Sequence, residues 1–258
     1  MLTNICEDRL IIISDLHLGN PACFTKRKIV EFLAYAADND YNLCINGDGF
    51  DIAQTSFVRL AQEVPEVFKQ FRRFEKKNLK VYYVIGNHDM VLEHFFEDWD
   101  LFTLAPFLNV TSGDLRVRIE HGHLYDSFFI KMPELYEIVT HIAGFFLSMT
   151  PWWYKFWMKG EKWWYKFRMG FEKMLGYLRQ RKTRERNIVG IAGEAPSISQ
   201  AARRILDRGF DAVVFGHTHH PGEVDINNLK YFNTGSWLIH TLYVEIIDGA
   251  ISLKNHEF

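Results

Sequence analysis

The sequence predicts an α/β fold, on two observations. Short apolar runs rich in β-branched residues alternate with helical patterns, and the first five of these runs end in polar clusters of Asp, His, Asn or Gly. Alternating strands and helices are typical of layered α/β domains. Ligands in such domains bind at the carboxyl ends of the strands, so the clusters also indicate where a functional site lies.

Strands are expected where branched and aromatic residues dominate a short run. In chain order these runs are residues 9–14, 42–46, 80–86, 115–122, 211–216, 230–235 and 241–247.

Two helical regions are expected between the early strands. Residues 25–39 place Ile29, Phe32 and Leu33 on one face of a helix, as a period of 3.6 residues requires. Residues 56–78 form a second helical region, in which Pro65 marks a break or a new start.

A long helical insertion is expected between two of the later strands. The chain from 125 to 195 reads as almost entirely helical and is too long for an ordinary connection. We therefore expect a core domain formed by residues 1–124 and 196–258, with a helical, aromatic and basic cap at 125–195.

The composition excludes several classes of protein. The net charge of −2 gives no sign of a polyanionic partner, and three scattered cysteines argue for a reducing compartment rather than a disulfide framework. Acidic residues precede the first apolar run, unlike in a signal peptide. No uncharged apolar stretch reaches the roughly 18 residues that a transmembrane helix needs, so we expect no transmembrane helix. A cytoplasmic location is expected from the reducing compartment.

Five polar clusters carry the chemistry. Each places Asp, His or Asn beside or close to Gly, a mixture that suits divalent Mn, Fe, Zn or Co, and none contains cysteine. One cluster alone would be an ordinary turn or helix cap, but five at successive strand ends indicate one shared metal site. The clusters are Asp15-Leu16-His17, Gly47-Asp48-Gly49-Phe50-Asp51, Gly86-Asn87-His88-Asp89, His121-Gly122-His123 and Gly216-His217-Thr218-His219. In the first cluster, strand alternation is expected to place Asp15 and His17 on one face.

This ordered set resembles the motifs of the calcineurin-like metallophosphoesterase superfamily, and Asn233-Thr234-Gly235-Ser236 resembles a further turn of that superfamily. The resemblance implies a four-layer α/β/β/α sandwich with two metal ions at one edge. It assigns Asp15, His17 and His219 to one ion, Asn87, His121 and His217 to the other, and Asp48 to both. It also implies that His88 faces the substrate, where it contacts the phosphate or protonates the leaving group. Supporting roles fall to Asp51, Asp89, His123 and Asp126.

Two divalent ions favour direct hydrolysis. A water shared between two ions about 3.5–4 Å apart loses a proton near neutral pH and becomes the nucleophile, while the ions neutralise the phosphate. We expect manganese, with Fe, Zn, Co or Ni as alternatives. The clusters contain no Ser or Cys nucleophile flanked by a base, so a covalent mechanism is less attractive.

The expected cap contains a repeat that lies outside these clusters. The sequence WWYKF occurs at 152–156 and again at 163–167, and a spacing of 11 residues brings both copies to the same helical face. Thr150 and Pro151 are suited to begin this helix. Its Trp and Phe residues form one arc, while Lys155, Lys159 and Lys162 begin a separate stripe beside it.

Three interpretations of this helix are open. An aromatic stripe is most often buried in a core or an oligomer contact, but core faces favour Leu, Ile and Val. The lysine stripe excludes a transmembrane helix. An interfacial helix fits best, because tryptophan prefers the headgroup level and lysine attracts anionic lipid. Residues 133–149 are apolar enough to pair with it in a helical hairpin.

The inserted cap makes the chain resemble the UDP-2,3-diacylglucosamine pyrophosphatases of lipid A synthesis. The resemblance implies a lipid-linked phosphate or pyrophosphate substrate, cleaved by a peripheral enzyme on the inner membrane surface. That family typically has Arg at the position of His88, so a different lipid or phosphate substrate is an alternative. A nucleotide phosphodiesterase or nuclease is a second, since basic and aromatic residues also bind nucleic acid, although the segregated arc does not favour it. A third alternative is a non-enzymatic scaffold on a degenerate phosphoesterase fold, but all expected ligand positions are filled, which disfavours it. Independently of these alternatives, the aromatic face could be an oligomer contact.

Overall fold

The structure is a computed structural model that describes residues 3–20, 23, 25–53, 55, 57–95, 97–99, 101–126, 129–130 and 190–258. The expected helices at 133–149 and from 150 onward lie outside these residues, so the cap and the division of the chain into core and cap stay predictions. Within the described residues, no helix has the length and apolar character needed to cross a bilayer.

The first of two mixed sheets has seven strands in the order β13-β12-β2-β3-β4-β6-β5. Its central strands β2, β3, β4 and β6 are parallel neighbours, so their carboxyl ends meet at one edge. The strands are β2 (Arg9–Ile13), β3 (Asn42–Asn46), β4 (Val81–Val84), β5 (Glu97–Trp99), β6 (Phe102–Ala105), β12 (Leu242–Ile247) and β13 (Ala250–Asn255).

The second sheet has six strands in the order β1-β7-β8-β9-β11-β10. Here β8 and β9 run parallel and lie side by side in the middle of the sheet. The strands are β1 (Asn4–Cys6), β7 (Leu108–Ser112), β8 (Leu115–Ile119), β9 (Ala212–Phe215), β10 (Gly222–Ile226) and β11 (Leu229–Asn233).

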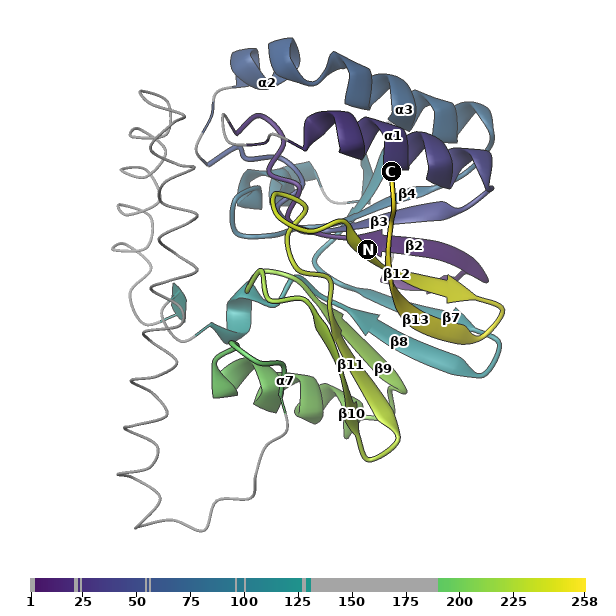
Figure 1. The fold of residues 1–258 in the computed structure, drawn as a ribbon, viewed down its shortest axis with the longest axis vertical. Coiled ribbons are helices and arrows are strands. Elements are labelled where there is room, and N and C mark those ends of the chain that lie inside the picture. Colours follow the sequence, from purple (N-terminus) through teal and green to yellow (C-terminus); the bar gives the residue numbers. More distant parts are fainter. Residues whose placement is uncertain are drawn as a thin grey trace.

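Helices cover the outer face of each sheet (Figure 1). On the first sheet lie α1 (Lys26–Asp38), α2 (Phe57–Glu63) and α3 (Pro65–Lys76), and on the second lies α7 (Pro196–Leu206). The break expected at Pro65 is confirmed: α2 ends at Glu63, and Pro65 begins α3, where its missing N–H has no helical partner to lose.

Strand alternation builds the layers. Ile11 and Ile13 pack toward α1 and α3, whereas Leu10 and Ile12 point into a second cluster between the two sheets. A third cluster joins α7 to the outer face of the second sheet, through residues such as Ile198 and Val213. Three apolar clusters thus separate four layers in the order helix, sheet, sheet, helix, which confirms the expected α/β sandwich within the described residues.

All seven expected strands are present, several of them one to three residues shorter than expected at an end. Six further strands were not expected, namely β1, β5, β6, β7, β10 and β13. They are short or carry many polar residues; β13, for example, has no fully buried residue. Their hydrophobic period was therefore too weak to detect.

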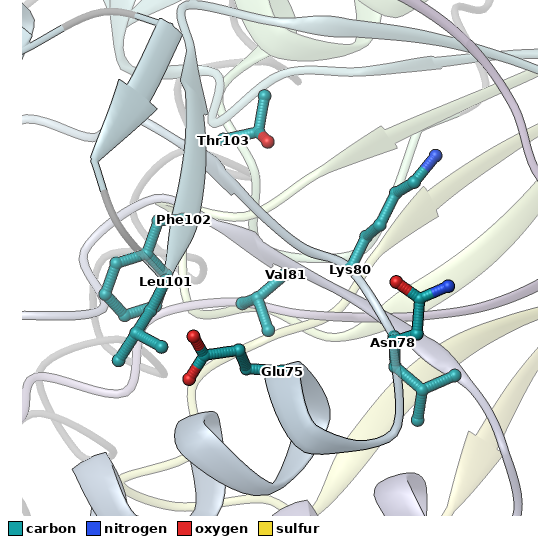
Figure 2. Close-up of a pocket in the computed structure, with 8 residues that line it drawn as sticks. Glu75, Asn78, Lys80, Val81, Leu101, Phe102 and Thr103 are labelled. Atoms are coloured by element: carbon teal, nitrogen blue, oxygen red, sulfur yellow. The ribbon is translucent and has the colours of Figure 1, made fainter.

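A pocket of about 190 Å³ opens at the amino end of β4 (Figure 2). It lies between the end of α3 and the start of β6, and its lining contains none of the expected site residues. The clusters at the carboxyl ends of the strands are therefore the candidate functional site. The pocket is lined by Glu75, Asn78, Leu79, Lys80, Val81, Leu101, Phe102 and Thr103.

Candidate metal centre

Five loops converge where the two sheets meet. The loops after β2, β3 and β4 come from the first sheet, and those after β8 and β9 come from the second. The structure brings all seven predicted ligands and His88 into this one region, where each contacts at least one other member of the set. The seven are Asp15, His17, Asp48, Asn87, His121, His217 and His219.

Asp15, His17 and His219 form the first half of the site. His219 Nε2 lies 3.1 Å from Asp15 Oδ1 and 3.4 Å from His17 Nε2. The tautomers of the two rings decide which of these imidazole nitrogens donates to the other. Two imidazoles and a carboxylate that aim at one point are a suitable set of ligands for a divalent ion.

Asn87 and His217 form part of the second half. His217 Nε2 lies 3.0 Å from Asp126 Oδ2, which can accept its ring N–H, and burial lowers the pKa of this histidine. His217 Nδ1 then carries a lone pair, yet it lies 2.9 Å from the amide oxygen of Asn87. In this tautomer the two atoms are placed to bind one divalent cation together.

His121 and Asp48 connect the two halves. His121 Nδ1 donates to the backbone carbonyl of Asn46 at 2.8 Å, which leaves Nε2 facing Asp48 Oδ2 at 3.3 Å. Burial lowers the pKa of His121, but Asp48 and Asp15 more than offset this and raise it to about 10. The same negative field would favour a metal cation on Nε2 in place of a proton.

The buried lone pairs fit a metal ion. Asp15 Oδ1 and His121 Nε2 are both buried and have no hydrogen-bond partner of suitable geometry among the described residues. Burial raises the pKa of Asp15 and of Asp48, but the neighbouring imidazoles outweigh this effect. The pKa of each carboxyl therefore lies below its ordinary value. Ionised carboxylates are costly at a buried point unless positive charge is placed beside them, and a divalent ion bound by these carboxylates and imidazoles would supply it.

The backbone at the site is strained. Five of the predicted ligands have positive φ angles, which non-glycine residues seldom adopt. The angles are 53° at Asp15, 46° at His17, 51° at Asp48, 64° at His217 and 59° at His219. The expectation that strand alternation aligns Asp15 with His17 is therefore wrong: β2 ends at Ile13, and a left-handed turn brings the two side chains together.

Glycines make room for the ligands. A Cβ on Gly86 would lie 2.2 Å from Asp48 Oδ1, and one on Gly216 would lie 2.6 Å from Asp15 Oδ2. Gly47 has a φ of +79°, and a Cβ there would lie 2.2 Å from His121 Nδ1. The glycines beside the clusters are therefore required by close approach to the ligands.

His88 lies at the rim, with its side chain 13% exposed. Its ring N–H donates from Nδ1 to Asp51 Oδ1 at 2.9 Å, and its backbone N–H donates to Asp48 Oδ1 at 2.8 Å. Burial lowers the pKa of His88, while Asp48 and Asp51 outweigh it and raise it to about 9.

The remaining expected supporting residues surround the ligands. Asp89 accepts hydrogen bonds from the backbone of Gly49 and Gly86, at 3.0 and 2.6 Å. His123 is buried beside His121 and His217. The sequence analysis missed Glu194, which accepts a hydrogen bond from Thr218 at 2.8 Å, between the ligands His217 and His219. No motif surrounds Glu194 in the sequence, so only the fold could have indicated it.

Comparison with known families agrees with this geometry. Residues 8–221 match the family described as calcineurin-like phosphoesterase. The chain belongs to this family. It is thus a phosphoesterase of a metal-dependent family, with a buried His and Asp cluster at its site.

Three solved structures are similar at low identity. An archaeal phosphodiesterase is 14% identical with a TM-score of 0.45, and the alignment covers 96% of this chain and 99% of that one. A predicted phosphoesterase from Streptococcus pneumoniae is 14% identical with a TM-score of 0.39, covering 96% and 98%. Vps29 from Entamoeba histolytica, solved with zinc, is 11% identical with a TM-score of 0.38, covering 96% and 98%. No curated protein matches the chain.

Proposed function

We propose that this phosphoesterase binds two divalent metal ions, preferably manganese, and hydrolyses a phosphate or pyrophosphate ester of a lipid-linked substrate. Asp15, His17 and His219 would hold one ion, Asn87, His121 and His217 the other, and Asp48 both. The observation that supports the two-ion centre is the convergence of ligand atoms in two adjoining clusters, Asp15 with His17 and His219, and Asp15 with Asp48 and His121.

When bound, the two ions would supply a nucleophilic water at neutral pH and would neutralise the charge of the phosphate. The protein fixes the geometry for this chemistry. Asp51 orients the His88 ring by accepting its Nδ1–H, which leaves the other ring nitrogen available. In this proposal, His88 binds a phosphate oxygen or gives a proton to the leaving group, and its neighbour Asn87 binds the metal.

The lipid part of the proposal is supported by the sequence. The WWYKF repeat and its lysine stripe predict an interfacial helix, and this helix would belong to an insertion between β8 and β9, two strands that both end at the metal centre. We infer that the protein is cytoplasmic, peripheral on the membrane, and acts on a substrate like UDP-2,3-diacylglucosamine. A nucleic-acid substrate is not favoured, because the aromatic and basic residues are segregated.

Turnover tests the substrate class. We expect the manganese-loaded protein to hydrolyse UDP-2,3-diacylglucosamine at least about tenfold faster, as kcat/KM, than the same nucleotide sugar without acyl chains, because burial of acyl CH₂ groups contributes to binding. Equal rates would contradict the lipid-linked substrate while leaving the phosphoesterase intact. Faster cleavage of single-stranded DNA would favour the nuclease alternative.

Flotation with vesicles tests the membrane surface. We expect the protein to float with vesicles that contain anionic lipid, and replacement of Lys155, Lys159 and Lys162 by Gln to reduce this binding. A matched control replaces Lys69, Arg72 and Lys76, all exposed on or near α3, by Gln. Equal loss in both triple variants, or no flotation of the wild type, would contradict a specific role of the stripe.

A further inference from the structure

Glu194 is a half-buried acidic side chain that the proposed chemistry does not use. Its carboxylate accepts hydrogen bonds from three side chains: Thr218 Oγ1 at 2.8 Å, Tyr231 Oη at 2.7 Å and Asn233 Nδ2 at 2.7 Å. Thr218 belongs to the loop after β9, whereas Tyr231 and Asn233 lie on β11. One carboxylate therefore connects the loop to the neighbouring strand of the sheet.

The position of Thr218 makes this contact important. Thr218 lies between His217 and His219, which are assigned to different ions, and both histidines have left-handed backbone, with φ of 64° and 59°. Such conformations are energetically unfavourable for non-glycine residues and persist only where the surroundings hold them. The Thr218 side chain is the part of the turn that Glu194 holds.

Asn233 holds the same turn from its other side. Its Nδ2 lies 2.9 Å from the carbonyl of Gly216 and 2.9 Å from Thr218 Oγ1, and its Oδ1 accepts from the backbone N–H of Gly235 at 2.8 Å. Glu194 orients this amide by accepting from Nδ2. The acidic residue therefore acts on the turn twice, directly through Thr218 and indirectly through Asn233.

The core fixes Glu194 in place. Ile191 is buried in the cluster under α7, and the backbone N–H of Glu194 donates to the carbonyl of Ile191 at 3.2 Å. Just after this turn, α7 begins at Pro196. The carboxylate is thus presented by a short segment held at both ends, which is what a support for a strained turn requires.

We infer that Glu194 is a positioning residue for the metal centre, which holds His217 and His219 in ligand geometry through Thr218 and Asn233. The inference rests on the proposed two-ion centre. It extends that centre to a residue outside the ligand motifs, in the stretch that joins the inserted segment to α7. Loss of a side chain that supports metal ligands typically weakens metal affinity about 10- to 100-fold.

The test measures manganese binding to metal-free protein by titration calorimetry, with folding of each variant checked by circular dichroism. We expect Glu194→Ala to weaken manganese binding at least about tenfold. Thr218→Val, which removes only the hydroxyl, should do the same, and Thr218→Ser, which keeps it, should bind almost as the wild type does. Glu223→Ala is the matched control, because Glu223 is an exposed glutamate of the same sheet that contacts Lys230.

The double variant Glu194→Ala/Thr218→Val separates positioning from general damage. Both changes remove the hydrogen bond from Thr218 to Glu194, so their effects on manganese affinity should be clearly less than additive. If Glu194→Ala does not fold, Glu194→Gln replaces it in the test, because it keeps the side-chain volume and one acceptor oxygen. We expect Glu194→Gln to weaken manganese binding by a smaller but measurable factor.

Two outcomes would overturn the inference. Wild-type manganese affinity in folded Glu194→Ala, even with a lowered melting temperature, would make Glu194 merely structural, and so would a loss that Thr218→Ser fails to rescue. Failure of the wild-type protein to bind manganese or any other divalent ion would instead refute the proposed metal centre, and the inference with it.

Discussion

At the scale of single residues, the site depends on which ring nitrogen carries the proton. The carbonyl of Asn46 fixes the N–H of His121 at Nδ1, and Asp126 fixes that of His217 at Nε2. Each contact leaves the other nitrogen facing the centre of the site. Hydrogen bonds to main-chain or acidic oxygens thus prepare the imidazoles as ligands before any ion binds.

Replacement of Asp48 by Ala should abolish turnover and leave the fold intact. The carboxylate of Asp48 lies between the two halves of the site and is expected to bridge both ions. Steady-state hydrolysis of a phosphodiester measures the loss, and circular dichroism checks the fold. Normal activity in the folded variant would refute the two-ion mechanism.

Replacement of His88 by Ala should separate chemistry from metal binding. We expect kcat to fall about 10²- to 10⁴-fold, the usual contribution of a positioned acid or base, while manganese affinity changes little. Steady-state kinetics and calorimetry measure the two quantities. His94→Ala, at an exposed histidine of the short 3₁₀ helix that follows the same loop, is the control and should keep wild-type kcat. A parallel loss of affinity and kcat would assign His88 to the metal instead.

At the scale of elements, the predicted metal ligands lie in the loops that follow parallel strands. Strong apolar runs in the sequence predicted β2, β3, β4, β8 and β9. The shared position of the polar clusters was predictable because parallel strands end at a common edge. The left-handed turns at Asp15 and His217 could not be predicted, since no residue type there requires positive φ. Glu194 also escaped prediction, because its three partners are distant in sequence and only the fold brings them together.

Substitution at Gly47 should be much more costly than at Gly113. Both glycines have positive φ, but a Cβ on Gly47 would lie 2.2 Å from His121 Nδ1, whereas one on Gly113 would have its nearest neighbour at 4.0 Å. We expect Gly47→Ala to lower the free energy of unfolding by about 2–4 kcal/mol, and Gly113→Ala by about 1 kcal/mol. Urea denaturation measures both, and equal losses would show that His121 does not crowd Gly47.

At the scale of the whole molecule, the site connects the two sheets. Asp15 follows β2 of the first sheet, and its Oδ2 accepts the backbone N–H of His217, which follows β9 of the second, at 3.1 Å. Ligands from both sheets would share the same ions. Bound metal should therefore stabilise the packing of one sheet against the other.

Metal removal should accordingly lower the melting temperature. Manganese at 100 times its dissociation constant is expected to stabilise the fold by about 2.7 kcal/mol per site, because it binds only the folded chain. Calorimetric scans with and without a chelator measure this difference. In Asp48→Ala the shift should be much smaller, and an equal shift in both proteins would indicate manganese binding elsewhere.

The proposed chemistry depends on two metal ions bridged by Asp48. Titration of metal-free protein with manganese, followed by electron paramagnetic resonance, tests it most directly. We expect saturation at two ions per chain and the spectrum of a magnetically interacting pair, as for ions about 3.5–4 Å apart. Saturation at a single isolated ion, or no binding at all, would contradict it.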